Sequence, residues 1–341
     1  MQGVLKNYWY LAAWGHELGE KPFARRLLDV PVVLFRDSNG EVAALHDRCP
    51  HRFARLSRGE MRNGNLRCAY HGLQFDGAGR CVHSPFAELP DGVAVTSFAV
   101  EEIDGFVWLW PGLPEEADTA RIPDMSYLRP LPDIQQLRMY ALQASNFKLG
   151  FDNLMDPSHV AFLHRQSLGQ GTDFLEQMFA SARYAWRKHG ADSVATEWRF
   201  PGPDGQEDPD ELFESIWVPP NIVVQRTRSR LVGERPPPGT YQHDIHILTP
   251  ETAHTTHYFS LETYEASKKE PGYAEARMQL LVQNTFMAED DPLLAEIDSE
   301  MGDQDLLAMK PLVLRTDTAA IQLRRIYSRL LSDETETPYQ A

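Results

Sequence analysis

The chain has 341 residues, of which 42% are hydrophobic and 24% charged, and its formal net charge is −16. This length suits about two domains, each with its own core. The acidic balance argues against a nucleic-acid partner, because phosphate binding requires basic patches. No apolar stretch has the length of a membrane span, and the three cysteines do not make a disulfide framework. We therefore expect a cytoplasmic protein that binds neither nucleic acid nor membrane.

Residues 1–115 are predicted to form a β-rich domain. Val32–Phe35 and Val42–Leu45 flank a Ser-Asn-Gly turn, which is typical of a β-hairpin. A second hairpin is predicted within residues 73–82, around an Asp-Gly-Ala-Gly turn. Phe106–Trp110 is a short apolar strand that ends at Pro-Gly. Many short strands separated by glycine turns indicate a small barrel or sandwich.

Two short motifs in this domain combine cysteine with histidine. Cys49 and His51 form a Cys-x-His pair, and after sixteen further residues Cys68 and His71 form a Cys-x-x-His pair. Two thiolates on one iron and two imidazoles on the other are the ligands of a Rieske [2Fe–2S] centre. A structural Cys2His2 zinc site uses the same residue types, but zinc fingers usually pair Cys with Cys and His with His. The alternation therefore favours a Rieske cluster over zinc.

Residues 116–132 are rich in proline and acidic side chains and are predicted to be a linker. Residues 133–341 are predicted to mix both kinds of element. Ala274–Met287 and Thr318–Leu331 have the apolar spacing of helices. The predicted strands are Trp217–Arg226, His243–Leu248 and His257–Leu261. Strands followed by a long terminal helix indicate an α+β domain.

A second candidate metal site begins at Asp156-x2-His159-x4-His164. Two imidazoles and one carboxylate form the facial triad of Fe(II) oxygenases. His159 and His164 are five residues apart, so both can bind one metal only if the backbone departs from a regular α-helix between them. Each residue also has an ordinary structural alternative: a core histidine for His159, a helix-terminal cation for His164, and an N-cap before Pro157 for Asp156.

The segment 146–164, together with the two Cys/His motifs, resembles the Rieske non-haem iron oxygenases of the vanillate demethylase and dicamba monooxygenase type. The matching pattern is NFKL followed by DNL, Asp, His and His, and the resemblance extends over nearly the whole chain. It implies an α+β fold, in which an all-β Rieske domain (1–115) precedes a helix-grip catalytic domain (133–341) with an antiparallel sheet and a long helix. It also implies two cofactors, a [2Fe–2S] Rieske cluster and a mononuclear Fe(II).

The resemblance places the third iron ligand on a late helix, at an aspartate within a Glu-Asp pair. The matching residues here are Glu289, Asp290 and Asp291. Helical spacing puts Asp290 on an apolar face with Phe286, Met287, Leu293, Leu294 and Ile297. A carboxylate there is costly unless it is paired or bound to a metal. Asp291 directly precedes a proline and has an alternative role as an N-cap. We therefore predict Asp290 as the ligand.

Further roles are implied by the resemblance alone. Asp156 matches a carboxylate that links the mononuclear iron of one subunit to a Rieske histidine of the next, around a homotrimer. Asn153 matches a position near the iron. Asn221 and His246 match substrate contacts, although they are also compatible with a strand asparagine at a turn and a hydrogen-bonded core histidine. Leu281 replaces a pocket tryptophan of dicamba monooxygenase, which favours a different ring or substituent.

The implied function is the terminal oxygenase component of a multicomponent monooxygenase. A reductase, a ferredoxin or both would deliver electrons from NAD(P)H, and O2 would serve to O-demethylate a methoxylated aromatic acid, which yields a phenol and formaldehyde. The alternative within the class is hydroxylation of a ring or of an aryl methyl group. Alternatives from other classes are a Rieske electron carrier and a zinc-stabilised binding module. More than 200 residues follow the cluster domain and contain a second ligand set, which disfavours the carrier.

Overall fold

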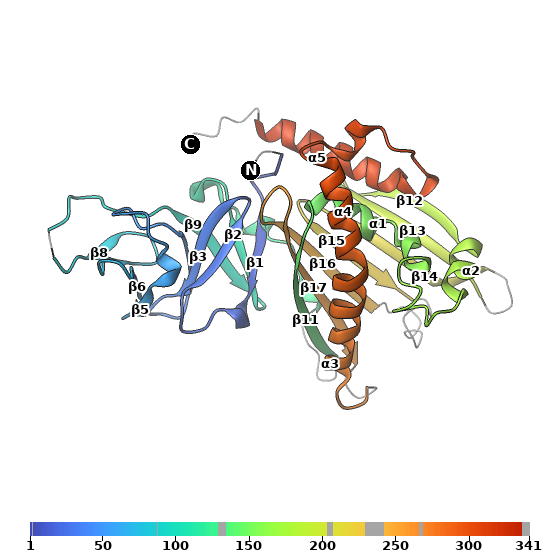
Figure 1. Ribbon diagram of the computed structural model, residues 1–341, viewed down its shortest axis with the longest axis horizontal. Coiled ribbons are helices and arrows are strands. Elements are labelled where there is room, and N and C mark those ends of the chain that lie inside the picture. Colours follow the sequence, from blue (N-terminus) through green and yellow to red (C-terminus); the bar gives the residue numbers. More distant parts are fainter. Residues whose placement is uncertain are drawn as a thin grey trace. The chain divides into compact units, whose positions relative to one another are not determined.

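The computed structural model describes residues 1, 3–86, 88–128, 134–202, 207–228, 242–265 and 269–335. The chain divides into two compact units, Met1–Arg129 and Pro130–Ala341 (Figure 1). The first unit includes residues 116–128 of the predicted linker, which contain short 3-10 helices such as Thr119–Arg121. There the Trp9 Nε1–H donates a hydrogen bond of 2.8 Å to the carbonyl of Asp118. Residues 129–133 of that linker lie outside the described residues.

The first unit contains two antiparallel sheets. One has the strand order β1-β10-β9-β4-β3-β2 and the other the order β5-β6-β7-β8. The strands are β1 Tyr10–Trp14, β2 Phe23–Leu27, β3 Val30–Arg36, β4 Val42–His46, β5 Glu60–Arg62, β6 Asn65–Arg67, β7 Gln74–Phe75, β8 Cys81–His83, β9 Ser97–Ile103 and β10 Phe106–Trp110. The two predicted hairpins are confirmed as β3–β4 and β7–β8, and the predicted strand at residues 106–110 is β10.

The core of the first unit extends to the two cysteines of the metal motifs. Val33 and Phe35 alternate along β3, so their side chains point to one face of the sheet. Both pack in a single apolar cluster with Cys49, Cys68 and Phe75. Because the cysteines pack in the same cluster as the strand residues, the burial of apolar side chains holds both cysteine-bearing loops against the sheets.

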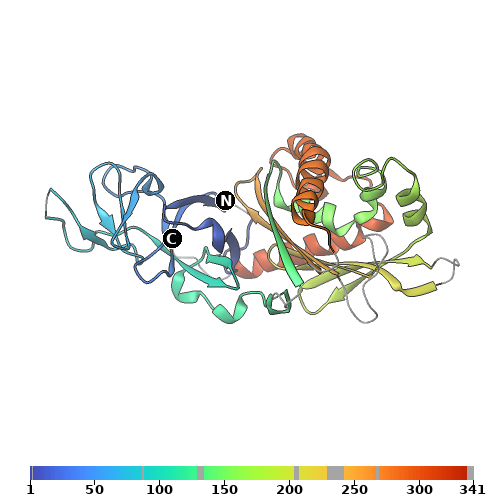
Figure 2. The same cartoon turned by 90° about the horizontal axis from the view of Figure 1, so that it is seen from below.

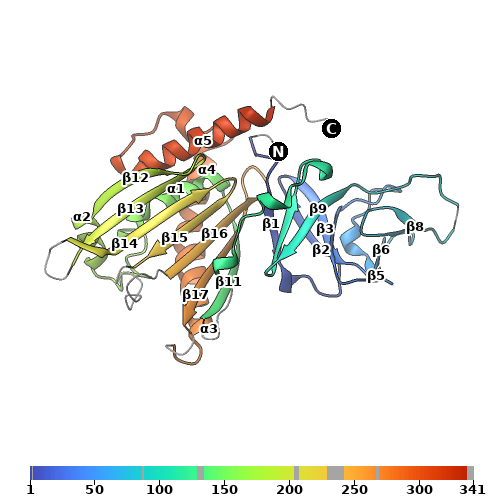
Figure 3. The same cartoon turned by 180° about the vertical axis from the view of Figure 1, so that it is seen from behind.

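The second unit contains a seven-stranded antiparallel sheet with the order β11-β17-β16-β15-β14-β13-β12. Figure 3 shows these strands in front of the helix that runs from Tyr273 to Met301. The strands are β11 Ile134–Gln143, β12 Arg183–His189, β13 Ser193–Pro201, β14 Glu207–Val218, β15 Ile222–Thr227, β16 Gln242–Pro250 and β17 Thr256–Glu265. The predicted strands at residues 243–248 and 257–261 are confirmed within β16 and β17.

The prediction of one strand over Trp217–Arg226 was wrong. β14 ends at Val218, a turn that contains Pro219 and Pro220 follows, and β15 begins at Ile222. Proline has no N–H to donate to a strand ladder, so two prolines in sequence interrupt the pairing. The prediction missed β11, β12, β13 and most of β14, although the alternating buried side chains of β11 (Leu137, Met139 and Ala141) are a strand pattern.

The helices of the second unit are α1 Phe147–Met155, α2 Phe174–Ser181, α3 Tyr273–Met278, α4 Asp291–Met301 and α5 Thr318–Thr335, and η9 is a π-helix over Gln279–Asp290. The segments α3, η9 and α4 form one continuous helix that lies along the sheet beside β11 (Figures 1 and 2). α1 packs on β14, β15 and β16, and α5 packs on β12 and β13. The helix predicted over Thr318–Leu331 is confirmed as α5.

The helix predicted over Ala274–Met287 is longer than expected and continues through Pro292 to Met301. Proline cannot donate the usual hydrogen bond to the residue four positions earlier. In the π-helical turn before it, the N–H of Asp291 donates to the carbonyl of Phe286, five residues earlier, so the helix is wider where the proline ring needs space. The proline is therefore accommodated without a break in the helix.

Candidate metal centres

The two cysteine-histidine loops of the first unit have the same backbone hydrogen bonds. The N–H of Cys49 donates to the carbonyl of Ala54 and the N–H of Phe53 to the carbonyl of Cys49, both at 2.9 Å. The N–H of Cys68 donates likewise to the fifth residue on, at 2.8 Å, and the N–H of Gly72 donates back to Cys68 at 3.1 Å. The fourth residue after each cysteine has a positive φ, 59° at Phe53 and 74° at Gly72. Each loop thus turns tightly and brings its histidine back beside its cysteine.

The side chains of these loops fit a [2Fe–2S] cluster. Cys49 and Cys68 are 2% and 3% exposed, and burial raises the pKa of the Cys49 thiol to about 11, so a bound cation is needed to hold it as a thiolate. The ring centroids of His51 and His71 are 4.5 Å apart. The Nδ1 atom of His71 is buried and has no hydrogen-bond partner among the described residues. A buried nitrogen of this kind is costly without a partner, and a metal ion would supply one.

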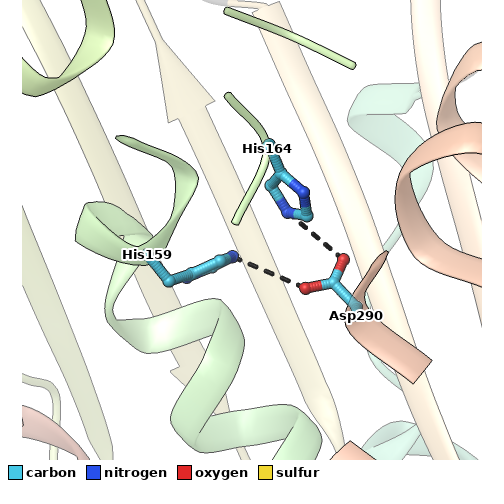
Figure 4. A group of neighbouring side chains, drawn as sticks. All are labelled: His159, His164 and Asp290. Carbon is cyan, nitrogen blue, oxygen red and sulfur yellow. Dashed lines mark ion pairs between the residues drawn. The ribbon is translucent and has the colours of Figure 1, made fainter. Parts of the chain in front are cut away.

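A second cluster of ligand-type atoms lies in the second unit. His159 is in a 3-10 helix over Pro157–Ala161, His164 is in the turn that follows, and Asp290 ends η9. Figure 4 shows both imidazoles directed toward the carboxylate of Asp290. The His159 Nε2 is 3.7 Å from Asp290 Oδ1, and the His164 Nε2 is 3.3 Å from Asp290 Oδ2. One ligand atom from each of the three residues lies within 4.8 Å of the others. The expected departure from a regular α-helix between the two histidines is present.

Hydrogen bonds to the other ring nitrogens set the tautomers of both histidines. The Nδ1–H of His159 donates to the carbonyl of Asp156 at 2.6 Å, and the Nδ1–H of His164 donates to Glu289 Oε2 at 2.7 Å. The Ser167 hydroxyl donates to the same carboxylate oxygen at 2.6 Å. Since each Nδ1 is a donor, each neutral ring offers Nε2 as a lone-pair ligand. This arrangement of outer partners is typical of metal-binding histidines.

The electrostatic environment differs between the two imidazoles. Burial lowers the pKa of His159, and the nearby Asp290 carboxylate only partly opposes this. Burial also acts to lower the pKa of His164, but hydrogen bonds to Asp290 and Glu289 outweigh it and raise the pKa. The sequence interpretation missed the role of Glu289, although its place next to Asp290 in an acidic run was the available signal.

Asn153 and Asp156 also lie at this cluster. The Asn153 side-chain amide donates to Asp290 Oδ1 at 2.9 Å and lies 3.4 Å from His159 Nε2. The Asp156 carboxylate accepts from the N–H of Ser158 at 3.0 Å, which is the N-cap interaction that the sequence offered as an alternative.

The alternative role of Asp291 as an N-cap was wrong. No cap is needed in the middle of a continuous helix, and its carboxylate instead accepts a 2.7 Å hydrogen bond from the N–H of Ala144. Asp290 is 6% exposed and packs near buried Phe286 and Leu294, whereas Met287 on the predicted apolar face is 36% exposed. The π-helical register therefore gives Asp290 and Asp291 different partners.

The cluster opens into a cavity of about 380 Å3 between the sheet and the long helix. His159, His164, Asp290 and Asn153 line it, as does His246 on β16. The other lining residues include Met139, Leu154, Val160, Leu175, Phe213, Gln225, Tyr258, Leu281 and Phe286. The walls are largely apolar with a few polar groups, which is usual for a small-molecule site.

Gln225 lines this cavity, whereas the predicted substrate contact Asn221 does not. Asn221 is fully buried in the turn after β14, where its amide donates to the Thr249 hydroxyl at 3.1 Å. The Gln225 amide nitrogen donates to the carbonyl of Leu154 at 3.2 Å, which turns its oxygen toward His246 Nε2 at 3.1 Å.

Both ring nitrogens of His246 have partners. Its Nε2–H donates to the oxygen of Gln225, and its Nδ1 accepts from the Tyr258 hydroxyl at 2.7 Å. Burial lowers the pKa of His246 to about 4, so the ring is neutral at ordinary pH. His246 therefore lines the cavity as a neutral group whose hydrogen bonds lie within the protein.

Comparison with known families defines the class of protein. Residues 8–98 match the Rieske [2Fe-2S] domain, and residues 143–333 match the vanillate O-demethylase oxygenase C-terminal domain. The chain belongs to this family of Rieske oxygenases; it is an oxidoreductase, and its N-terminal domain is of the type that carries a [2Fe–2S] cluster. As an oxygenase component it acts with separate electron-donor proteins. No helix among the described residues combines the length and apolarity that crossing a membrane requires.

Similar proteins support this assignment over nearly the full length. The chain is 32% identical to the dicamba O-demethylase oxygenase component of Stenotrophomonas maltophilia, over 96% of this chain and 97% of that protein. It is 30% identical to the toluene-4-sulfonate monooxygenase system iron-sulfur subunit TsaM1 of Comamonas testosteroni, over 97% of this chain and 98% of that protein. The crystal structure of dicamba monooxygenase bound to dicamba is 31% identical, covers 97% of this chain and 98% of its own, and has a TM-score of 0.81.

Proposed function

We propose that the protein is the terminal oxygenase component of a multicomponent monooxygenase that O-demethylates a methoxylated aromatic compound with O2. The observation that carries the proposal is the buried carboxylate of Asp290 between the imidazoles of His159 and His164, at the wall of a mostly apolar cavity. The similarity to a dicamba O-demethylase component supports the same reaction type.

We assign the metal ligands as follows. Cys49, Cys68, His51 and His71 hold the [2Fe–2S] cluster, which supplies one-electron transfer when bound. His159, His164 and Asp290 hold a mononuclear Fe(II), which supplies the oxygen chemistry when bound.

The residues around the mononuclear site orient its ligands and keep water out. Asn153 holds one oxygen of Asp290 by a hydrogen bond, and Glu289 holds the Nδ1–H of His164. Phe286 and Leu281 supply apolar wall. An aromatic ring bound there displaces water from the cavity, and the neutral imidazole of His246 places no positive charge in the cavity wall.

The proposal extends to the assembly. We place the Rieske domain at residues 1–115, a connecting segment at 116–132 and the catalytic domain at 133–341. A reductase, a ferredoxin or both donate the electrons, and the subunits form a homotrimer in which Asp156 joins the mononuclear site to a Rieske histidine of the neighbouring subunit. One oxygen of Asp156 caps the 3-10 helix. We place the protein in the cytoplasm, because two reduced cysteines that act as metal ligands fit a reducing compartment.

Hydroxylation of an aryl methyl group is the second candidate reaction. It is supported by the similarity to the toluene-4-sulfonate monooxygenase subunit. The two reactions differ in their products: O-demethylation releases formaldehyde with a phenol, whereas aryl-methyl hydroxylation keeps all carbon atoms in a benzylic alcohol.

Metal analysis and product analysis test the proposal. The purified protein should be brown with a Rieske spectrum, and should contain labile sulfide and iron in excess of the cluster's two irons. With a surrogate reductase, NADH and O2, a methoxyarene should give equal amounts of phenol and formaldehyde. Bound zinc without labile sulfide would contradict the metal assignment, and a benzylic alcohol from a methyl-substituted arene without any demethylation would favour the second reaction.

A further inference from the structure

The cavity has a polar end that is separate from the metal-ligand cluster. Asp244 on β16 pairs in register with Gln225 on β15 and with Glu262 on β17, so these three side chains share one face of the sheet. Arg277 of α3 contacts Glu262, and all four residues line the cavity. Arg277 and Asp290 are on the same continuous helix, thirteen residues apart, which is up to roughly 20 Å along the axis.

The single cation at this end is already paired. The Arg277 Nε is 2.7 Å from Glu262 Oε2, and the Glu262 side chain is 3% exposed. The Tyr273 hydroxyl and the Gln242 amide donate to the other oxygen of Glu262, at 3.2 and 3.4 Å. These three donors satisfy the Glu262 carboxylate. The Arg277 guanidinium uses only Nε in the pair, but Glu262 already balances its positive charge, and Asp244 adds a second acidic group, so an anion would meet no excess positive charge at this end.

Asp244, in contrast, has capacity to accept a hydrogen bond. Its Oδ1 atom is buried and has no hydrogen-bond partner among the described residues. Burial, followed by the charge of Glu262, raises the pKa of Asp244 to about 7, and Arg277 only partly opposes this. A buried oxygen of this kind is stabilised by a donor that a ligand brings with it.

The remaining lining residues offer no counter-ion to a carboxylate. Among the described lining residues, Arg277 is the only Lys or Arg. His246 is neutral and its two ring nitrogens are engaged by Gln225 and Tyr258. An aromatic carboxylate placed away from the metal would therefore be buried close to two acidic side chains, with no cation among the described lining residues that is not already paired, which is unfavourable.

We propose that the polar end formed by Asp244, Glu262 and Arg277 selects substrates that carry a hydrogen-bond donor remote from the reacting group, and rejects aromatic carboxylates. Suitable donors are a hydroxyl, an amide N–H or a protonated amine. The inference rests on the proposed function for the position of the methoxy group at the metal end. It replaces the expectation of an aromatic acid with a neutral or cationic aromatic, and it assigns Asp244 as the specificity-determining residue.

Equilibrium binding to the holoenzyme tests this selectivity without turnover. The ligands are para-methoxybenzylamine, para-methoxybenzamide and para-methoxybenzoate, together with the corresponding methoxybiphenyls, which reach further along the cavity. By titration calorimetry, the amine and amide in at least one series should bind about tenfold or more tightly than the carboxylate. Tighter binding of the carboxylate in both series, or no binding by any ligand, overturns the proposal.

The Asp244→Asn variant tests the assigned residue. It removes the negative charge but keeps the size, so the amine should lose about tenfold in affinity while the carboxylate loses none. Asp303→Asn is the matched control, because the side chain of Asp303 is 99% exposed, and it should leave all affinities unchanged. If Asp244→Asn has the same ratio of amine affinity to carboxylate affinity as the wild-type protein, the proposal is overturned. If this variant does not fold, the order of the three affinities in the wild-type protein decides the question.

The pH dependence gives a second readout. As pH rises through about 7, Asp244 gains its charge, so the affinity of the protonated amine for the wild-type protein should rise between pH 6 and pH 8, on the basis of the raised pKa. Glu262, Arg277 and Tyr273 also face this group, and the pKa of Arg277 and of Tyr273 is raised, so neither changes charge in this interval. Asp244→Asn should remove the rise, and a rise that persists in this variant contradicts the assignment.

Product analysis separates this proposal from the proposed function. If the amine or amide binds as expected but yields no phenol and formaldehyde, the selectivity stands and O-demethylation does not. If the carboxylate binds most tightly and is demethylated, O-demethylation stands and the selectivity does not.

Discussion

The two candidate metal centres are built in different ways. In the first unit, both ligand pairs come from neighbouring loops, and each loop is shaped by the same backbone hydrogen bonds around Cys49 and Cys68. In the second unit, Glu289 and His164 are separated by 125 residues in the sequence and meet through a side-chain hydrogen bond. The first centre depends on local backbone conformation, whereas the second depends on the packing of a long helix against a sheet.

The two centres should therefore respond to different kinds of substitution. A change of side chain near the second centre should alter metal binding with little effect on the fold, because its outer hydrogen bonds are made by side chains. A change of backbone freedom near the first centre should act through the shape of a loop. Four substitutions test this contrast, and three of them have a control variant.

Asp290→Ala should have the largest effect. It removes the only carboxylate in the set of His159, His164 and Asp290, so the loss of metal affinity should exceed the roughly 10–100-fold cost of changing an outer partner. Iron analysis should show loss of the mononuclear iron, with the Rieske spectrum intact and turnover abolished.

Asp291→Ala is the matched control for Asp290→Ala. It leaves the N–H of Ala144 without its acceptor, which should cost about 1 kcal/mol in the free energy of unfolding, with iron retained. Loss of iron from Asp291→Ala alone would mean that the helix register at the metal is different from the one in the structure.

Asp156→Asn should keep the cap but lose most turnover. Asparagine caps a helix about as well as aspartate, and the Nδ1–H of His159 donates to the main-chain carbonyl, which the substitution leaves in place. An asparagine NH2 would face the donor N–H of a neighbouring histidine, so the proposed link between centres should fail.

Rapid-mixing spectroscopy measures the effect of Asp156→Asn. The Rieske cluster should still be reduced, electron transfer from it should slow by about tenfold or more, and both metals should be retained. Product formation near the wild-type rate would show that Asp156 acts only as a cap.

Glu289→Gln should have a smaller effect on the same centre. An amide oxygen can still accept from the Nδ1–H of His164, but without the negative charge, so the affinity for Fe(II) should fall by about tenfold. A chelator-competition titration measures this affinity. Ser167→Ala is the control, because it removes another donor to the same carboxylate and should leave the affinity of the site within about threefold.

Gly72→Ala should have the smallest effect, on the first centre. Its φ of 74° is in the left-handed region, and an added Cβ would lie 3.1 Å from the Pro85 ring. The expected cost is about 1–2 kcal/mol in the free energy of unfolding, measured by urea, with a shift in the Rieske spectrum. Gly92→Ala is the control: its φ of 77° carries the same strain, but no atom lies within 4 Å, so its spectrum should not shift. A shift in both variants would contradict a local effect on the loop.

Local sequence patterns were sufficient to predict the elements whose contacts are close in the chain. The alternation of cysteine and histidine in two short motifs identified the Rieske domain, since such local spacing is sufficient to shape two small loops. The β3–β4 and β7–β8 hairpins were likewise predictable, because turn residues and apolar strands are neighbours in sequence. Helix α5 was predictable from its apolar spacing.

The contacts between residues far apart in the chain became known from the three-dimensional fold. Local patterns did not predict that Glu289 would hold His164, that Asp291 would bind Ala144, or that Gln225 would line the cavity in place of Asn221. The physical reason is that these contacts depend on strand register and on the π-helical turn before Pro292, and each is fixed by the burial of many side chains at once. The residue types indicate which reactions are possible, and the packing of the long helix on the sheet decides which side chains face the substrate.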